Sequence, residues 1–218
     1  MAERRGLFIV LEGGDGVGKT TQGRLLAEHL RGRGHEVVVT HEPGDTRAGA
    51  VIRRLLLDPA TGDLDPRAEA LLYAADKAQH LAEVVRPALQ RGAMVVCDRY
   101  VDSMLAYQGA GRVLDVDEVA GIARWATGGL DPDLTVLLDL DPARAVGRMT
   151  DPDRLEAAGD GFHRRVRDGF LGLAAAHPER YLVLPARDDR AHLAARIARA
   201  VDALGARPVS VDSGTMEP

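Results

Sequence analysis

Short apolar runs alternate with longer amphipathic stretches along most of this chain. Each run is rich in Val, Leu and Ile without regular polar interruptions, which is typical of parallel strands buried on both faces of a sheet. The runs predict five strands, at residues 8–11, 36–40, 93–97, 134–139 and 181–184. This pattern indicates an α/β fold in which helices flank a five-stranded parallel sheet.

Between the runs, apolar residues recur at the spacing of amphipathic helices. Asp58-Pro59 marks the end of one such helix, and Asp65-Pro66 marks the start of the next. The spacing predicts helices at residues 19–32, 51–56, 66–91, 117–126, 161–175 and 189–204, a helix around Tyr107, and one that begins at 142–148 and breaks at 149–154. We expect one domain over residues 1–205 with a short lid at about 148–161, and a disordered tail at 206–218.

Composition limits the kinds of protein that this chain can be. Its 218 residues are 45% hydrophobic, which suits one packed domain. A net charge of -5 argues against a nucleic-acid partner or an anionic membrane surface. Cys97 is the only cysteine, so no internal disulfide can form, and the apolar run at residues 7–11 is too short for an export signal. We expect a soluble, cytoplasmic protein with no membrane partner.

A glycine-rich segment after the first predicted strand carries the clearest chemical signal. It fits the pattern G-x-x-x-x-G-K-[ST], in which backbone N–H groups and the positive end of a helix surround a polyphosphate. We expect Lys19 to bridge the β- and γ-phosphates of ATP and Thr20 to offer its hydroxyl to Mg²⁺. The predicted ATP phosphate site consists of Gly13, Gly14, Asp15, Gly16, Val17, Gly18, Lys19 and Thr20.

Other residues narrow the class of P-loop protein. Lys19 and Lys77 are the only lysines, so the N-K-x-D element of a GTP switch is missing. A motor-like ATPase stays open as an alternative, because the third predicted strand ends in Asp98, which can organise Mg²⁺. Arg148 and Arg154 flank an Asp-Pro segment of the predicted lid, where they would place positive charge on a transferring phosphate and exclude water. An arginine-bearing lid favours a small kinase. The other interpretation of the segment is a solvated surface loop.

Several separate motifs follow one another in a fixed order between the first and the last predicted strand. They are Glu42-Pro43-Gly44 and the segments 72–80 (LYAADKAQH), 98–103 (DRYVDS), 106–109 (AYQG), 153–156 (DRLE) and 162–166 (FHRRV). Their order and spacing resemble bacterial thymidylate kinase (dTMP kinase), a P-loop nucleoside monophosphate kinase. The resemblance implies a three-layer P-loop kinase fold, the reaction ATP + dTMP → ADP + dTDP, the use of Mg²⁺, and a homodimer.

The same resemblance implies roles for individual residues. Asp15 matches the acid that meets the 3′-hydroxyl of the acceptor sugar, and Tyr73 matches the aromatic ring that stacks on thymine. Arg53 and Arg99 match arginines that hold the monophosphate, and Asp98 matches the acid that, with Thr20, lies near Mg²⁺. The implied dTMP site consists of Asp15, Glu42, Pro43, Arg53, Tyr73, Lys77, Arg99, Ser103, Met104 and Gln108, and the implied catalytic residues are Lys19, Asp15, Arg99, Arg148 and Arg154.

Four positions depart from the pattern of that family. Asp45 stands where a second glycine is usual, and Ala50 stands where a glutamate is common. Lys77 replaces an arginine, which exchanges a bidentate fork for a point charge. Met104 occupies the place of a Ser, Thr or Asn that bonds to the base. The departures keep two alternatives open: a kinase for another deoxynucleoside monophosphate, and a P-loop module that binds nucleotide without catalysis.

Overall fold

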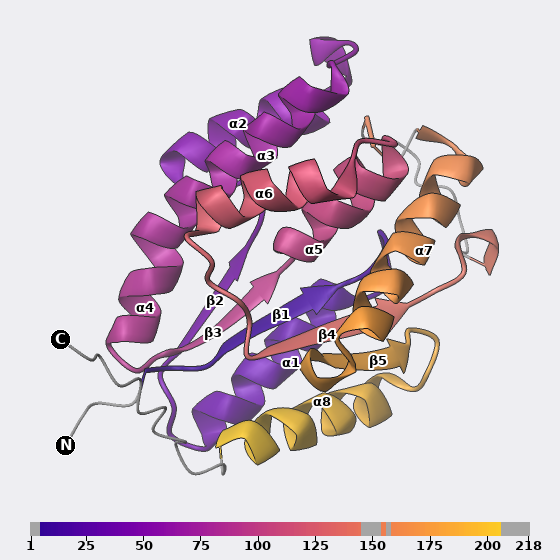
Figure 1. The fold of residues 1–218 in the computed structure, drawn as a ribbon. Helices are drawn as coiled ribbons and strands as arrows, with labels where there is room; N and C mark the ends of the chain where they lie inside the picture. Colours follow the sequence, from indigo (N-terminus) through magenta and orange to yellow (C-terminus); the bar gives the residue numbers. More distant parts are fainter. Residues whose placement is uncertain (1–4, 145–153, 156–157, 206–218) are drawn as a thin grey trace, which may run out of the picture.

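Five parallel strands form the centre of the molecule (Figure 1). The computed structural model describes residues 5–144, 154–155 and 158–205. The strands are β1 (Phe8–Glu12), β2 (Val37–His41), β3 (Met94–Asp98), β4 (Leu134–Asp139) and β5 (Tyr181–Pro185). Their order in the sheet is β2-β3-β1-β4-β5, so β1 lies between β3 and β4, and Ile9 pairs with Val96 on one side and Leu134 on the other. The predicted five-stranded parallel sheet is confirmed.

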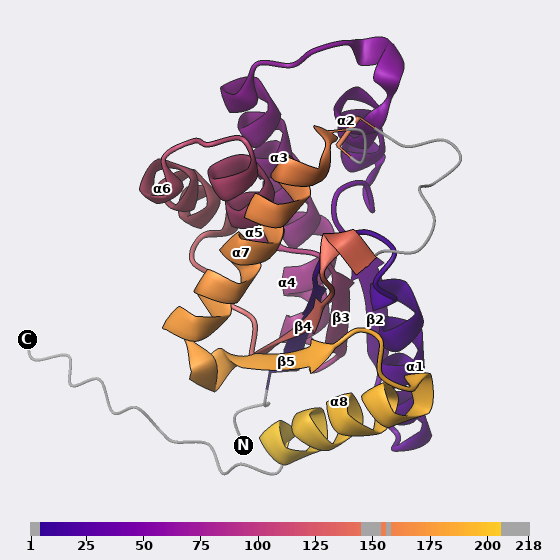
Figure 2. The same ribbon diagram turned by 90° about the vertical axis from the view of Figure 1, so that its right-hand side faces the viewer.

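Helices connect successive strands. The α-helices are α1 (Lys19–Gly32), α2 (Arg47–Leu57), α3 (Pro66–His80), α4 (Arg86–Gln90), α5 (Val101–Met104), α6 (Val116–Thr127), α7 (Asp160–Ala176) and α8 (Arg190–Gly205). The 3₁₀ turns are η1 (Pro59–Thr61), η4 (Pro142–Arg144) and η6 (Pro178–Arg180), and the π turns are η2 (Leu81–Val85) and η3 (Leu105–Gly111). Helices lie on both sides of the sheet in the two views of Figures 1 and 2.

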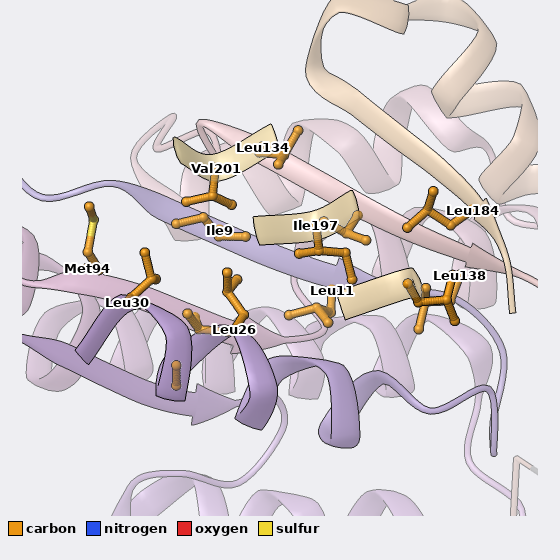
Figure 3. Packing of buried hydrophobic residues seen from close by; sticks show 14 of the residues in the cluster. Ile9, Leu11, Leu26, Leu30, Met94, Leu134, Leu138, Leu184, Ile197 and Val201 are labelled. Atoms are coloured by element: carbon orange, nitrogen blue, oxygen red, sulfur yellow. The ribbon is translucent and has the colours of Figure 1, made fainter. Parts of the chain in front are cut away.

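The side chains of β1 alternate between the two faces of the sheet, as the pleat of a strand requires. Ile9 and Leu11 join Leu26 of α1 and Ile197 of α8 in one buried cluster (Figure 3). Phe8 and Val10 pack on the other face of the sheet with residues of η2 and α4. Because both faces are buried, the strand reads as a continuous apolar run in the sequence.

The long helix predicted at residues 66–91 is present, but a π turn divides it. α3 ends at His80, η2 follows, and α4 starts at Arg86 with Pro87 in its first turn. Pro87 has no backbone N–H, and its ring crowds the carbonyl four residues earlier, which lies within η2. The wider π turn therefore falls where a regular helix would be strained.

Two further elements differ in detail from the predictions. β2 starts one residue later than the predicted strand at 36–40. On α2, Leu56 is fully buried, whereas Val51 and Leu55 remain almost half exposed. The apolar spacing thus predicted the helix correctly but not which of its side chains lie in the core. The helix predicted around Tyr107 consists of α5 followed by the π turn η3.

Some predicted features fall outside the residues that the structure describes. The helix predicted to begin at 142–148 starts as the turn η4, and its remainder lies outside the described residues together with most of the predicted lid. The tail at 206–218 also lies outside them. None of the described helices is long and apolar enough to cross a membrane.

Candidate active site

Backbone hydrogen bonds tie the carboxyl ends of β1, β2 and β3 together at one edge of the sheet. The amide N of Arg99 donates to Leu11 O at 2.9 Å, and the amide N of Glu42 donates to Asp98 O at 3.0 Å. Arg99 has a φ of 72°, in the left-handed region that non-glycine residues seldom adopt. The backbone from which the side chains after these strands project is therefore fixed by hydrogen bonds. The backbone of Arg99 is also strained.

The glycine-rich loop runs from β1 into α1 on the same edge. Gly13 has a φ of 134°, and a Cβ there would lie 2.4 Å from Leu138 O, so only glycine fits. Gly18 caps α1 in a left-handed conformation, and no side chain caps the helix. The Nζ of Lys19 donates to Gly13 O at 3.1 Å and to Gly14 O at 2.6 Å. The loop can present backbone N–H groups and a lysine to an anion.

The electrostatic surroundings of Lys19 make its ammonium proton easier to remove. Burial and the nearby Arg99 guanidinium lower the pKa of Lys19 to about 8, against the opposing charges of Asp15, Asp98 and Glu12. A negative phosphate beside this lysine would favour the charged form again. Lys19 is thus a cation that an anionic ligand stabilises.

Thr20 and Asp98 meet next to the loop. Thr20 Oγ1 donates to Asp98 Oδ2 at 2.7 Å, which brings a hydroxyl from α1 beside a carboxylate at the end of β3. Oxygen donors of this kind suit Mg²⁺, which usually keeps waters and substrate phosphates as its other ligands. Within the described residues, no cluster of three His, Cys, Asp or Glu side chains could hold a metal by itself. The chemistry of this pair fits a magnesium ion shared with phosphates.

Arg99, Asp15 and Tyr107 form a bonded group between the loop and η3. Arg99 pairs with Asp15 Oδ1 and donates to Gly13 O at 3.0 Å and to Ser103 Oγ at 3.1 Å. Tyr107 donates its hydroxyl to Asp15 Oδ2 at 2.9 Å. Burial would raise the pKa of Asp15, but the charges of Arg99 and Lys19 outweigh it and hold the pKa below its ordinary value. Asp15 is therefore an ionised acceptor.

Glu12 lies behind this group and holds the segment after β3. It is fully buried and accepts from Tyr100 N at 2.8 Å, Ser103 N at 3.1 Å and Ser103 Oγ at 2.6 Å. Burial and the nearby Asp102 raise the pKa of Glu12 to about 7, although Arg99 opposes the rise. Since Ser103 also bonds to Arg99, Glu12 positions the arginine from behind.

A second buried carboxylate, Glu42, follows β2. Lys77 Nζ donates to Glu42 Oε2 at 2.5 Å and to Tyr100 O at 2.9 Å, and His80 Nδ1 lies 2.7 Å from Glu42 Oε1. Burial raises the pKa of Glu42, but Lys77 and His80 more than compensate and lower it overall. Two of the three ammonium protons of Lys77 are therefore used in hydrogen bonds within the protein. The peptide bond between Glu42 and Pro43 is cis.

A third buried carboxylate, Glu69 of α3, bonds to three side chains from two other segments. Gln108 Nε2 donates to Glu69 Oε1 at 2.9 Å, and Arg112 donates to both oxygens, at 3.2 and 3.1 Å. Arg154 pairs with Glu69 Oε2 and donates from Nε to Leu56 O at 2.9 Å. Glu69 therefore joins α3, η3 and the segment around Arg154.

One pocket connects these groups. Its empty volume is about 550 Å³, a figure that includes open solvent at the mouth. Arg53 donates to Pro43 O at 2.8 Å along its wall, and Leu57 and Leu155 add apolar surface. The lining residues are Asp15, Glu42, Pro43, Arg53, Leu57, Tyr73, Lys77, Arg99, Ser103, Met104, Tyr107, Gln108 and Leu155.

Comparison with known proteins identifies the family. The family model described as thymidylate kinase matches residues 11–197. A thymidylate kinase of Cutibacterium acnes is 59% identical over 91% of this chain and 98% of its own length. A thymidylate kinase of Clavibacter sepedonicus is 60% identical over 88% of this chain and 92% of its own length. The chain belongs to the thymidylate kinase family.

Membership of the thymidylate kinase family makes the chain an enzyme that phosphorylates dTMP to dTDP with ATP. A crystal structure of thymidylate kinase from Ehrlichia chaffeensis has a TM-score of 0.76 and 32% identity, and it covers 91% of this chain and 99% of that chain. The predicted fold and enzyme class are confirmed. The alternative of a non-catalytic P-loop module is wrong.

All ten residues of the predicted dTMP site lie together, because each lines the same pocket. Lys19, Thr20 and Asp98 lie at the adjacent loop, and Arg154 lies on Glu69 rather than on the loop. Arg148 falls outside the described residues.

Sequence reasoning assigned no role to four residues that organise this thymidylate kinase site: Glu12, Glu69, Tyr107 and Arg112. Glu12 carried a signal, because it is a charged residue at the end of an otherwise apolar buried strand. Tyr107 stands in the AYQG motif. Glu69 and Arg112 gave no local signal, since they meet only through the tertiary fold.

Proposed function

We propose that the pocket binds dTMP and that the adjacent P-loop binds ATP, so that phosphate passes between them at Asp15 and Arg99. The observation that carries this proposal is the Asp15–Arg99 ion pair, because Asp15 belongs to the P-loop while both side chains line the pocket. The site of the phosphate donor ATP and the site of the acceptor dTMP are then adjacent, with the Asp15–Arg99 pair between them. Such proximity is a large part of what a kinase must supply.

In this proposal the acceptor phosphate binds to Arg99 and Arg53. Guanidinium groups match phosphate oxygens in a bidentate manner. Arg99 is preorganised by Gly13 O and Ser103 Oγ, while Arg53 is held at Pro43 O. Both arginines line the pocket, so their charge would orient the phosphate without a large rearrangement.

The P-loop N–H groups and Lys19 would hold the β- and γ-phosphates of ATP. Thr20 and Asp98 would hold Mg²⁺, which neutralises phosphate charge when bound. An oxygen of the dTMP phosphate attacks the γ-phosphorus, the bond between that phosphorus and the β–γ bridging oxygen breaks, and ADP leaves with the electron pair. Lys19 stabilises the charge that develops during this transfer.

The nucleoside would extend from Asp15 toward α3. We propose that Asp15 accepts the 3′-hydroxyl of the sugar, with Tyr107 at its other oxygen, and that Tyr73 stacks on the base. Met104 and Gln108 would border the base. Glu42, Pro43 and Ser103 would shape the pocket, with Lys77 fixed on Glu42.

The lid would act by charge and by exclusion of water. Arg154 is bonded to Glu69 and to Leu56 O, at the edge of the pocket that Leu155 lines. We propose that Arg154, with Arg148, moves onto the transferring phosphate when both nucleotides are bound. Excluding water at that moment prevents simple hydrolysis of ATP.

We also propose that the enzyme is a cytoplasmic homodimer, formed through α2, α3 and α6. α3 packs against both α2 and α6, and each helix leaves apolar side chains exposed, among them Leu55, Leu71 and Trp125, whose exposed fraction is 85%. Exposed apolar surface of this kind favours a second copy. Sedimentation equilibrium should give twice the chain mass, and Leu71→Glu should shift it toward the monomer; a wild-type protein that sediments as a monomer refutes the proposed dimer.

The function is tested by coupled ADP release from the purified protein with ATP and Mg²⁺. We expect ADP formation to depend on dTMP, and dTMP to have the highest kcat/KM in a panel with dUMP, dCMP, dGMP and dAMP. ADP release that is independent of any monophosphate would contradict the proposed acceptor site. Arg53→Ala should raise the KM for dTMP more than the KM for ATP, because its charge is placed on the acceptor side.

A further inference from the structure

Gln108 is held in one orientation by Glu69. The distance from Gln108 Nε2 to Glu69 Oε1 is 2.9 Å, and both side chains are buried. Burial raises the pKa of Glu69, but the bonds from Arg112, Gln108 and Arg154 outweigh it and lower the pKa overall. An ionised carboxylate only accepts hydrogen bonds, so the amide must turn its NH₂ group toward Glu69. Its carbonyl oxygen is then the end directed away from Glu69.

Glu69 is itself fixed, which makes this orientation persistent. Arg112 bonds to both carboxylate oxygens, and this pairing does not depend on Arg154, which we propose to leave Glu69 when both nucleotides are bound. A bidentate guanidinium on a fully buried carboxylate stabilises its charge and restricts its rotation. The NH₂ group of Gln108 therefore always faces a hydrogen-bond acceptor, the carboxylate of Glu69.

The other side chains near the base offer few competing donors or acceptors. Met104 has no N–H or O–H group, and two of the three protons on Lys77 are used by Glu42 and Tyr100. Tyr73 presents a ring that would stack on any base. Gln108 also lines the pocket, so its carbonyl oxygen, which is directed away from Glu69, can discriminate between pyrimidines.

We propose that Glu69 is a positioning residue for base selectivity: it turns Gln108 so that the amide carbonyl faces the base and accepts the N3–H of thymine. Thymine and uracil carry this proton, whereas cytosine has a lone pair at N3. A carbonyl that faces a lone pair is left without a partner and rejects the ligand. The inference rests on the proposed dTMP site, and it adds the device that excludes dCMP.

The test is the ratio of kcat/KM for dTMP to that for dCMP. In Glu69→Gln the new amide can donate or accept, so Gln108 can rotate, and we expect the ratio to fall roughly tenfold or more. The double variant Glu69→Gln/Gln108→Glu exchanges donor and acceptor, again turns an oxygen toward the base, and should restore the ratio to within about threefold. A merely structural role of Glu69 would lower both efficiencies together and leave the ratio unchanged.

Glu83→Gln is the matched control. It replaces the carboxylate of an exposed glutamate that accepts from Gln79, a Gln–Glu pair away from the pocket, so its ratio should stay within about threefold of wild type. A fall in Glu83→Gln as large as in Glu69→Gln overturns the inference, as does an unchanged ratio in Glu69→Gln. If Glu69→Gln does not fold, Gln108→Leu decides: a lost preference supports the inference and a retained one overturns it. A wild-type protein that phosphorylates no pyrimidine monophosphate overturns the proposed function itself.

Discussion

The two ends of the pocket are built in different ways. At the phosphate end, backbone groups and strand termini hold the chemistry: Lys19 bonds to loop carbonyls, and Arg99 projects from a ladder bond to Leu11. At the base end, side chains from separate helices hold one another through buried carboxylates, as Gln108 and Arg154 do on Glu69. The first end depends on the course of the main chain, and the second depends on tertiary pairing.

This difference predicts different consequences of mutation. Lys19 at the phosphate end can be removed without loosening neighbouring side chains, because it bonds to loop carbonyls and the backbone frame remains. A side chain at the base end shares its partners, so a change there reorients other side chains. Substitution of Lys19 in the P-loop should therefore act mainly on kcat, whereas substitutions at the base end should act mainly on selectivity.

The largest effect is expected from Lys19→Ala. Loss of the cation that stabilises the transferring phosphate should lower kcat by about 10³-fold or more, while the fold persists because the glycine loop remains. Steady-state ADP release and thermal unfolding measure the two outcomes. Arg24→Ala on the same helix α1, which removes an exposed cation, is the control and should leave kcat unchanged. A kcat within tenfold of wild type in Lys19→Ala would exclude the P-loop from the mechanism.

The second largest effect is expected from Arg154→Ala. This variant tests whether Arg154, which bonds to Glu69 at the base end, acts on the transferring phosphate. If Arg154 leaves Glu69 for the transferring phosphate, its loss should lower kcat by about 10²-fold and raise the KM for dTMP much less. Initial rates at saturating ATP separate the two constants. An unchanged kcat with a raised KM for ATP would instead make Arg154 a docking residue and leave the catalytic charge to Arg148.

The same contrast explains how much the sequence could predict. The sheet and the phosphate loop were predictable because apolar runs and the G-x-x-x-x-G-K-T pattern are local, and because Asp98 ends a strand that Arg99 directly follows. Carboxylate partners are not local. Glu69 lies 39 residues from Gln108 and 85 from Arg154 along the chain, and no periodicity links such positions.

Sequence reasoning also missed the arrangement that holds Lys77. In the sequence, the lysine in place of the usual arginine was a point charge in the implied dTMP site, but its Nζ lies on Glu42 and Tyr100 O. Glu42 could be predicted to lie at the carboxyl edge of the sheet, since it follows a strand. That its carboxylate turns toward α3 depends on packing around His80, which the sequence does not reveal.

A smaller effect, on stability rather than rate, is expected at Glu12. Its pKa of about 7 lies above the ordinary value of 4.5, so between these values the folded state binds more protons than the unfolded state. The free energy of unfolding should therefore fall as the pH rises through this window, by an amount on the order of 2 kcal/mol. Glu12→Gln lacks this titration, so wild type should lose several °C of Tm relative to it between pH 5 and pH 7.5.

Two comparisons test whether Glu12 causes the pH dependence of stability. Glu28→Gln, on the exposed surface of α1, should show the pH dependence of wild type. The constant loss of hydrogen bonds in Glu12→Gln shifts Tm equally at each pH, so only the change of the difference with pH counts. A difference that stays constant across the window would mean that Glu12 does not titrate there.

The smallest effect on catalysis or selectivity is expected at Met104, which places an apolar side chain at the base end. Met104 is buried among small residues of α3 and α6, so Met104→Ser leaves a cavity and lowers the free energy of unfolding by about 2 kcal/mol or more. Met104→Ala makes a similar cavity without a hydroxyl and is the matched control. The serine hydroxyl adds a second group beside Gln108 that can bond to the base, so the dTMP-to-dCMP ratio of kcat/KM should be about threefold higher in Met104→Ser than in Met104→Ala. Equal ratios in the two variants would show that position 104 does not contact the polar edge of the base. Selectivity would then depend on Gln108 alone, and the contrast between the two ends of the pocket would reduce to one oriented amide.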